Sequence, residues 1–420
     1  MSKAKSRANT DRLPIAHASP NPYRFPWVRS VLAAVLAVAL FGGVAGALMI
    51  NNLDHQIKDS VISTANRGSD NSQSATVVNE ELPPDAFEGR PVNILVSGID
   101  SRYNENGEIG AGTIDLDPTI RSDTTMILHL SADRQHATIL SIPRDMMVDI
   151  PSCQTADGSY TYAHYGMFNS AFADGAGLDD IAGGIACTQA TVEDFTGITI
   201  DGFVVIDFTG FSRLVDTLGG VDICLDEAMY DELAGLDVPA GCQTLHGQQA
   251  LAFARARKDL ADGSDLRRID RQQWLIGQMV SQILDSNMFT NLPSLYKFVQ
   301  EGLSTSKFSP SLNSWRTDAA LLNSIRNTPR ENIRFVTTPY LPDPEDENRV
   351  LPDYYQASAI FQALIDDQPL PAGTLFRNLQ NQTFIVGDAG EAIMTDDLGN
   401  PYELDENGAP IIPSDEETGE

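Results

Sequence analysis

The chain has 420 residues, of which 42% are hydrophobic and 20% are charged, so it can bury a sizeable core and is not disordered throughout. Its 58 acidic residues outnumber its 28 basic ones, and the formal net charge is -30. Such a surface repels nucleic acid, whose phosphates need broad basic patches, and this argues against DNA binding and against a transcription regulator.

The first clear pattern along the chain is residues 31–50, VLAAVLAVALFGGVAGALMI, which carry no charge. A helix of about 20 apolar residues can cross the ~30 Å hydrocarbon core of a bilayer. Residues 1–30 hold six Lys and Arg against one acid, so the positive-inside rule predicts a cytoplasmic N-terminus and an exported remainder. A cleaved signal peptide is the alternative, but the apolar stretch is longer than a typical signal core and no small-residue cleavage site follows Ile50.

Residues 51–88 are rich in Asn, Ser, Asp and Glu and are predicted to be a polar extracytoplasmic linker. All cysteines follow it, on the side where disulfides persist: Cys153, Cys187, Cys224 and Cys242. Four cysteines allow three pairings. The expected pairing joins Cys224 to Cys242, which closes the shorter loop, and leaves Cys153 with Cys187; four free buried thiols are the alternative.

From residue 89 onward, strand-like and helical patterns alternate. VNILVSG, TTMILHLSA and ATILSIP have the length and composition of strands. Further along the chain, the patterns predict helices at 179–195 and 211–218, strands at 201–208 and 220–225, and the strongest helix at 265–285. This alternation predicts an α/β (α-β-α-like) fold with a central mixed β-sheet flanked by helices.

The predicted domain covers residues 89–370, and NIRFVTTP at 332–339 is expected to be its last strand. Residues 371–420 are acidic, and the part after Arg377 contains no Lys or Arg. Acidic sequences without apolar periodicity rarely fold, so this segment is predicted to be a flexible C-terminal extension.

Charged residues stand at the ends of the first three strand-like runs. In chain order they are Asp100, Arg102, Arg121, Asp123, Arg144 and Asp145. Functional groups of α/β sheets often lie just beyond strand ends, where the strands hold them rigidly. Pro143 ends the third run, so Arg144 is expected to leave the sheet there.

A second charged group lies in LAFARARKDLADGSDLRRIDRQQ, residues 251–273, which holds six of the 28 Lys and Arg within the seventeen positions 255–271. Arg255 and Arg257 share a face only in extended backbone, so we expect a helix to give way to strand-like chain there. Arg268 and Gln272 fall on one face of the following helix, with Arg271 alongside.

Arginine forks match phosphate oxygens, and paired aspartates suit a Mg²⁺ ion that bridges phosphates, so together these groups predict a site for a pyrophosphate ester. Each residue alone is more often part of a surface ion pair. The sequence contains no GxxxxGK[ST] loop, GxSxG elbow or HExxH motif. His164 and His246 have no second ligand at metal spacing and are expected to be structural.

The ordered set GID-SR, RSDTT, SIPRD, FNSAFADG, LGGVDI, LHGQQALAFARAR and D-x-x-R-x-x-RQQ resembles the LytR-CpsA-Psr family over residues 90–285. The resemblance implies a membrane-anchored, extracytoplasmic transferase. Such an enzyme moves a glycopolymer from a polyprenyl (undecaprenyl or decaprenyl) pyrophosphate carrier onto peptidoglycan and leaves a phosphodiester bond. Residues 103–120 form a long insertion between the first two motifs, a departure from the family pattern.

By motif, Asp100 and Asp123 are similar to the family's acids that bind Mg²⁺, or Mn²⁺ in its place. The residues similar to its pyrophosphate contacts and their supports are Arg102, Arg121, Arg144, Arg255, Arg257, Arg268, Arg271, Gln272 and Gln273. Asp145, another Asp without metal, or the substrate phosphate could accept the proton. Two rival functions share these residues: a lipid pyrophosphate hydrolase, and an anchored module that only binds polymer or polyprenyl phosphate.

Overall fold

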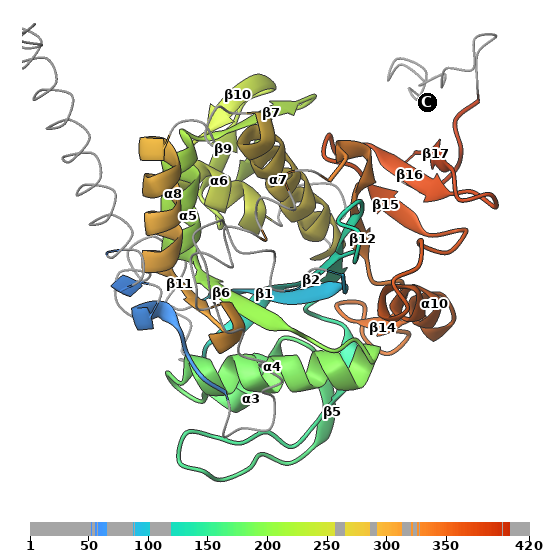
Figure 1. Ribbon diagram of the computed structural model, residues 1–420. Helices are drawn as coiled ribbons and strands as arrows, with labels where there is room; N and C mark the ends of the chain where they lie inside the picture. Colours follow the sequence, from blue (N-terminus) through green and yellow to red (C-terminus); the bar gives the residue numbers. More distant parts are fainter. Residues whose placement is uncertain are drawn as a thin grey trace, which may run out of the picture. The chain divides into compact units, whose positions relative to one another are not determined.

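A mixed β-sheet lies at the centre of the computed structural model (Figure 1), which describes residues 52, 55–56, 58–64, 87, 89–100, 119–256, 265–285, 292–312, 321, 326, 328–396 and 398–403. In this part of the chain the sheet has nine strands in the order β11-β6-β1-β2-β3-β12-β15-β16-β17. Their bounds are β1 Val92–Asp100, β2 Arg121–Leu130, β3 Ala137–Ile142, β6 Gly202–Asp207, β11 Ser306–Phe308, β12 Ile333–Thr337, β15 Leu375–Arg377, β16 Thr383–Val386 and β17 Ala392–Met394.

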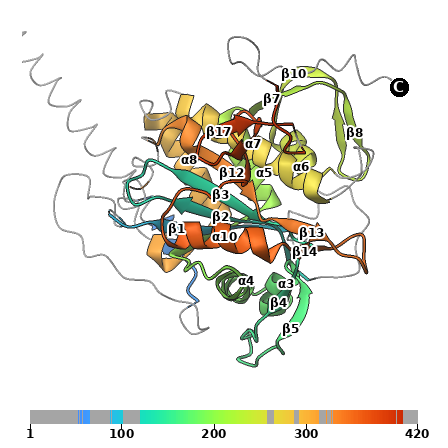
Figure 2. The same cartoon turned by 90° about the vertical axis from the view of Figure 1, so that its right-hand side faces the viewer.

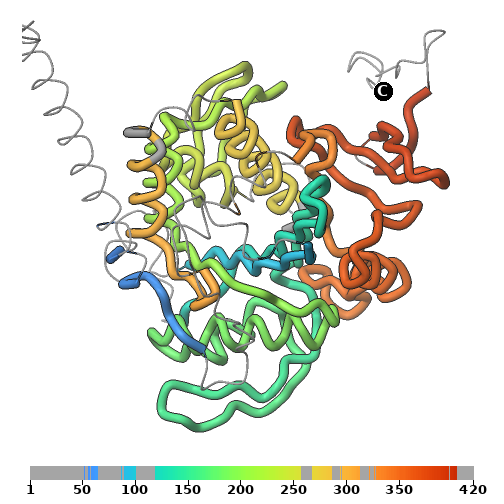
Figure 3. The backbone as a smooth tube through the Cα atoms, viewed as in Figure 1, coloured from blue at the N-terminus to red at the C-terminus, as the bar shows by residue number. Residues whose placement is uncertain are grey.

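The pairing within this sheet is both parallel and antiparallel. β1 runs parallel to β6, and β3 parallel to β12, although each pair is far apart in the sequence (Figure 3). The pairs β1–β2 and β2–β3 are antiparallel. All six residues of β3 are buried, as expected for an apolar strand covered on both faces. The predicted mixed sheet is confirmed.

Helices cover both faces of the sheet (Figure 2). On one face lie α3 Ser170–Ala176, α4 Ile181–Thr196 and α10 Tyr354–Ile365. On the other lie α5 Phe208–Leu218, α6 Gly247–Arg255, α7 Asp265–Asp285 and α8 Leu292–Thr305. The predicted helices at 179–195, 211–218 and 265–285 correspond to α4, α5 and α7, and the predicted strand at 201–208 corresponds to β6.

Four two-stranded antiparallel sheets and two 3-10 turns complete the described elements. The paired strands are β4 Met147–Ile150 with β5 His164–Met167, β7 Val221–Leu225 with β10 Gly241–Leu245, β8 Met229–Asp231 with β9 Leu236–Val238, and β13 Tyr340–Pro342 with β14 Val350–Pro352. The turns are η2 Pro310–Leu312 and η3 Arg330–Asn332. β7 confirms the strand predicted at 220–225.

The predicted linker at 51–88 is too long. The amide of Ile62 donates to the carbonyl of Phe308 at 3.0 Å, the Ser60 hydroxyl donates to the Leu303 carbonyl, and Thr64 is fully buried. Ile62 also packs against the main core. Two apolar residues within this polar stretch are enough to attach the segment to β11. The average composition of residues 51–88 is polar and therefore did not predict the attachment.

The predicted domain end at residue 370 is also wrong, and β12 is not the last strand. β15, β16 and β17 extend the sheet beyond it. Their apolar residues are few but well placed: the rings of Phe376 and Phe384 stack with centroids 5.4 Å apart, and Leu379 and Val386 are buried. The acids of this region lie in the connections, so composition predicted disorder where hairpins form. Residues 404–420 lie outside the described residues.

The predicted membrane helix at 31–50 also lies outside the described residues. Among the residues that are described, no helix combines the length and the apolar character needed to cross a bilayer.

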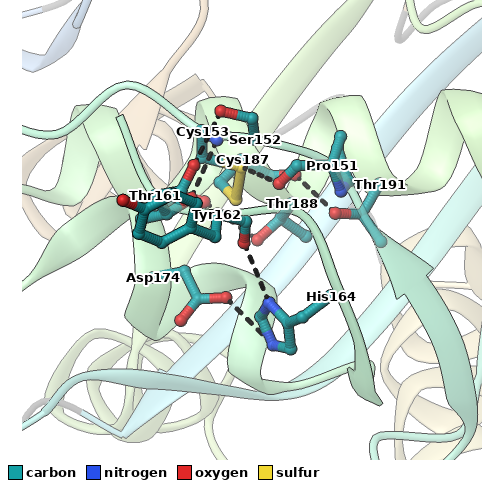
Figure 4. Close-up of a disulfide and its surroundings, with 11 residues drawn as sticks. Pro151, Ser152, Cys153, Thr161, Tyr162, His164, Asp174, Cys187, Thr188 and Thr191 are labelled. Atoms are coloured by element: carbon teal, nitrogen blue, oxygen red, sulfur yellow. Dashed lines mark hydrogen bonds and ion pairs between the residues drawn. A yellow bond between two sulfur atoms is a disulfide. The ribbon is translucent and has the colours of Figure 1, made fainter. Parts of the chain in front are cut away.

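The four cysteines form two disulfides, with the pairing expected from the sequence. Cys224 and Cys242 lie opposite each other in the register of β7 and β10. Cys153 and Cys187 join the loop after β4 to α4 across 34 residues of sequence (Figure 4). The alternative of four free thiols is wrong.

Replacing Cys153 and Cys187 together by Ser should lower the free energy of unfolding by about 3 to 4 kcal/mol, because the 34-residue loop then gains entropy in the unfolded chain. Urea unfolding of the oxidised full chain measures the change. The matched variant with Cys224 and Cys242 replaced, whose separation is 18, should lose slightly less. Equal urea midpoints for wild type and the first variant would contradict the expectation.

Candidate active site

A cavity of about 300 Å³ lies between the sheet and the helices α5, α6 and α7. Its floor consists of β1 and β2, whose alternate residues Val96, Gly98, Thr124 and Met126 face it. Alternate residues of a strand face the same side of a sheet, so these four residues face the helices α5, α6 and α7.

Most of this cavity has an apolar wall. The lining side chains from the helices include Phe208, Phe211, Leu251, Leu275 and Ile276. Of the helices predicted from the sequence, α5 and α7 line the cavity, whereas α4 packs into the core on the opposite face of the sheet.

At one end of the cavity the lining becomes charged, and five predicted site residues meet there from five different segments. Asp100 ends β1, Asp123 lies in β2, Arg144 follows β3, Arg255 ends α6 and Arg268 lies in α7. Gln272 lines the same cavity one turn after Arg268. The sequence motifs therefore identified residues that the fold brings together.

A β-bulge presents Asp123 to the cavity. Gly98 pairs with Thr124 while Ile99 pairs with Ser122, so Asp123 is the extra residue of β2. A bulge of this kind redirects a side chain relative to the normal alternation. Ser122 instead lies on the other side, where its hydroxyl bonds to those of Ser97 and Thr125 at 2.9 and 2.8 Å.

Asp123 is the negative centre of the arginine cluster. Its Oδ1 lies 2.5 Å from Nη1 of Arg144, and its backbone carbonyl accepts a bond of 3.1 Å from Nη2 of Arg268. Burial alone would raise the pKa of Asp123, but the charges of Arg268, Arg144 and Arg255 outweigh burial and lower the pKa below its ordinary value. The carboxylate therefore stays ionised at neutral pH.

The end of α6 places Arg255 at the cavity. Its guanidinium carbon lies 4.7 Å from the centre of the Phe208 ring, a cation–π contact. The next residue, Ala256, has φ -54 and ψ 137, so the predicted change from helix to extended chain occurs there. Arg271 donates to the carbonyl of Ala256, and Gln272 donates to that of Ala254 at 3.3 Å. α7 thus fixes the backbone that carries Arg255.

Several predicted residues lie outside the lining of the cavity. Burial lowers the pKa of Arg271, whose guanidinium donates to a backbone carbonyl at the end of α6. Gln273 is buried and donates to the hydroxyls of Ser141 and Thr337 at 2.9 and 3.0 Å, which joins α7 to β3 and β12. Asp145 is buried next to the cavity, with Oδ1 3.3 Å from Nε of Arg144.

Arg121 pairs in register with Asp100, at the point where the chain enters and leaves the insertion. Burial raises the pKa of Asp174 on α3, although His164 and Arg121 lie close enough to oppose this. Arg121 is not among the residues that line the cavity. Arg102, Arg257 and residues 103–118 of the insertion lie outside the described residues.

Two acids that line the cavity were not predicted. Asp207 caps α5 by accepting the Gly210 amide at 2.7 Å, and Asp231 accepts the amides of Leu233 and Ala234 at 3.0 and 3.1 Å. An Asp immediately before a helical pattern is a recognisable cap signal, so Asp207 could have been found. Asp231 has no such signal, because its position depends on the β8–β9 hairpin.

The protein thus combines an α/β fold with an apolar cavity in which arginines gather around a carboxylate. A family comparison makes this specific: residues 53–360 match the LytR_cpsA_psr family model, and the chain belongs to that family. The resemblance inferred from the motifs is confirmed.

Named relatives agree with this assignment. The chain is 29% identical to the cell wall biosynthesis protein LcpA of Corynebacterium glutamicum over 380 residues, 85% of this chain and 69% of LcpA. It is 31% identical to TagT of Bacillus subtilis, named a polyisoprenyl-teichoic acid–peptidoglycan teichoic acid transferase, over 64% of this chain and 73% of TagT. A crystal structure from Streptococcus agalactiae shares the fold, with a TM-score of 0.53 and 19% identity over 66% of this chain and 88% of that one.

Replacing Asp123 by Asn should change how stability depends on pH. Because the folded pKa of Asp123 is lowered, its ion pairs stabilise the protein above the unfolded pKa of about 3.9, and this contribution is lost as the pH falls through the folded pKa. The gap in melting temperature between wild type and the variant should be constant from about pH 5 to 7 and shrink below about pH 4. A gap that stays constant down to pH 3 would contradict the lowered pKa.

Replacing Gln273 by Leu should lower the free energy of unfolding by about 1 to 3 kcal/mol, because the buried Ser141 hydroxyl and the half-buried Thr337 hydroxyl lose their donor. Binding of inorganic pyrophosphate, followed by calorimetry, should be unchanged. Gln278→Leu is the matched control on α7, since Gln278 donates one hydrogen bond within the described part of the chain, to the Leu379 carbonyl at 3.0 Å. Weaker pyrophosphate binding by Gln273→Leu, with normal binding by the control, would instead favour the ligand contact predicted from the sequence.

Proposed function

We propose that this protein is a membrane-anchored, extracytoplasmic phosphotransferase that moves a glycopolymer from a polyprenyl pyrophosphate carrier onto peptidoglycan. One observation carries the proposal: a single cavity joins an apolar wall to a charged end with Asp123, Arg144, Arg255 and Arg268. A polyprenyl diphosphate likewise consists of a long apolar chain joined to a charged group. The names of the relatives, one of them a teichoic acid transferase that uses a polyisoprenyl carrier, support this choice.

The charged end suits phosphate for two reasons. Arginine forks form paired, charge-assisted bonds with phosphate oxygens. The cluster is also local, because the chain as a whole carries a net charge of -30 and its acids would repel an anion elsewhere. The apolar wall, including Phe211 and Leu275, would take the first units of the polyprenyl chain.

The acids at this end fit a divalent cation. Mg²⁺ usually takes one or two carboxylates from a protein and completes its shell with substrate phosphates and water. Asp100 and Asp123 line the cavity together, and the pKa of Asp123 is lowered, so that carboxylate is ionised as a ligand must be. We propose that these two residues hold Mg²⁺, or Mn²⁺, which would supply charge stabilisation to the phosphate oxygens.

In the proposed reaction, a sugar hydroxyl of the acceptor attacks the phosphorus on the glycan side of the pyrophosphate. The bond from the acceptor oxygen to phosphorus forms, the bond to the bridging oxygen breaks, and polyprenyl phosphate leaves. Arg144, Arg255 and Arg268 bind the phosphate oxygens and stabilise their charge in the transition state. Asp123 orients Arg144 and Arg268 through its side chain and backbone.

The hydroxyl proton needs an acceptor. Asp123 is a poor base because its pKa is lowered by the arginines. Asp145 lies 3.3 Å from Arg144, so it is the carboxylate that we propose for this role, and the substrate phosphate is the alternative acceptor.

Two features support an exported domain. The chain forms both disulfides that its cysteines allow, and disulfides persist in oxidising compartments. The apolar stretch 31–50 follows a basic N-terminal segment, the order expected for an anchor with a cytoplasmic N-terminus.

The purified full chain in detergent, given Mg²⁺, a labelled polyprenyl pyrophosphate glycan and peptidoglycan fragments, should join label to the fragments. Arg255→Ala and Asp100→Ala should each lower the rate by about 100-fold or more, the usual effect of removing one group that stabilises transition-state charge. Arg213→Ala is the control, because Arg213 is exposed on α5 and does not line the cavity.

Other outcomes would favour the two rival functions. Release of free glycan phosphate without labelled peptidoglycan would indicate a hydrolase. Tight donor binding without turnover, unaffected by Asp100→Ala, would indicate a module that only binds the lipid-linked polymer.

A further inference from the structure

A second cavity, of about 460 Å³, lies away from the charged cluster. Its walls are the β4–β5 hairpin, the end of α4 and the beginning of α10. The side chains that give it its chemistry are Asp149, His164, Tyr165, Asp194, Phe195 and Tyr354. Neither the sequence motifs nor the proposed phosphate chemistry uses any of them.

The aromatic side chains of this cavity are unusually open. Tyr165 is 56% exposed and Tyr354 is 57% exposed, although aromatic residues gain most from burial. The Tyr354 ring is held edge-to-face against Phe195, with centroids 6.3 Å apart, so it is positioned rather than loose. Open, positioned tyrosines offer flat apolar surfaces on which the C–H face of a sugar ring can stack.

Carboxylates stand beside these rings. Asp149 lies opposite Tyr165 in the register of β4 and β5, and Asp194 is exposed at the end of α4. Partial burial, together with nearby Tyr354, Asp343 and Asp149, raises the pKa of Tyr165. An ionised carboxylate only accepts hydrogen bonds, so this cavity matches hydroxyl and amide N–H donors and repels phosphate. Its chemistry suits an uncharged glycan with acetamido groups.

The walls of the second cavity are fixed before any ligand arrives. The Cys153–Cys187 disulfide ties the chain after β4 to α4, seven residues before Asp194 on the same helix (Figure 4). His164 also lines this cavity, and its Nε2 lies 3.6 Å from Oδ2 of Asp174 on α3, which ties the hairpin to that helix. Preset walls reduce the entropy lost when a ligand binds.

The second cavity is attached to the charged cluster through Arg144. The amide of Asn169 donates to the Arg144 carbonyl at 3.0 Å, and that of Phe168 donates to the Met146 carbonyl at 2.8 Å, so the hairpin is anchored next to this arginine. From Arg144 to Asp149 the chain can span at most about 18 Å, a few sugar rings.

The two cavities also lie on opposite sides of the sheet, since α5 and α7 line the first whereas α4 and α10 line the second. In phosphoryl transfer the attacking and leaving oxygens are roughly in line. With the lipid phosphate leaving into the first cavity, the acceptor hydroxyl approaches from the side away from that cavity, so the acceptor subsite is expected outside it.

We propose that the second cavity is the acceptor subsite, which binds an uncharged stretch of the peptidoglycan glycan strand through Tyr165, Tyr354 and Asp149. This inference rests on the proposed function, but glycan binding can be measured without donor and without turnover.

The test uses the full chain in detergent and titrates uncharged oligomers of N-acetylglucosamine by calorimetry, in the absence of donor. Tyr165→Ala and Tyr354→Ala should each weaken binding by about 3- to 10-fold, and Tyr354→Phe, which keeps the ring, should restore most of it. Tyr355→Ala is the matched control, because Tyr355 is the next residue of α10, is 90% exposed and does not line the cavity.

The same variants in the transfer assay should raise the KM for acceptor and leave donor binding unchanged. Unaltered glycan binding by the double variant of Tyr165 and Tyr354 would overturn the proposal, as would the absence of glycan binding to wild type. Tighter binding of a polyglycerol phosphate than of glycan, lost in the same variants, would overturn it too and assign the cavity to a phosphate polymer. A failure of transfer alone, with glycan binding that depends on Tyr354, would count against the proposed function and still support the subsite.

Discussion

The attraction between one carboxylate and three arginines is the interaction on which the rest of this site depends. Arg144, Arg255 and Arg268 would repel one another at the end of a partly buried cavity, and Asp123 offsets that repulsion by direct contact with two of them. Asp145 adds a second carboxylate beside Arg144, and Asp100, Asp207 and Asp231 line the same cavity. The carboxylates therefore hold the arginines in place before a diphosphate arrives.

The sheet gives this cluster its rigidity and also separates two kinds of chemistry. Strand β3 is buried on both faces, so it fixes the backbone position of Arg144, which lies two residues after its end. On one face lies the apolar cavity, and on the other lie the tyrosines and carboxylates next to the β4–β5 hairpin. The backbone bonds from Phe168 and Asn169 to Met146 and Arg144 join the two faces. A movement of the hairpin would therefore shift the arginine directly.

Local patterns in the sequence predicted much of this architecture. Apolar runs of strand length, apolar stripes along helices and charged residues at strand ends can all be recognised from residues that are close together in the sequence. The bounds of α7 and the convergence of Asp100, Asp123 and Arg268 were obtained in that way. Long-range features were missed. The bulge at Asp123 depends on the register between two strands, Asp231 depends on a separate hairpin, and the burial of Gln273 depends on hydroxyls from two other strands. Composition misled at both ends, where a few apolar residues among many acids attach segments to the sheet.

The acidic surface has a consequence for how the cluster recognises its ligand. At physiological ionic strength, charges farther apart than about 8 Å are largely screened, so the net charge of -30 does not prevent a diphosphate from binding once it is inside the cavity. Phosphate-rich wall polymers would also be repelled at close range by the carboxylates beside Tyr165. Under the two proposals, selectivity follows from position: an anion binds where an apolar chain can enter beside it, and an uncharged glycan binds where carboxylates repel anions.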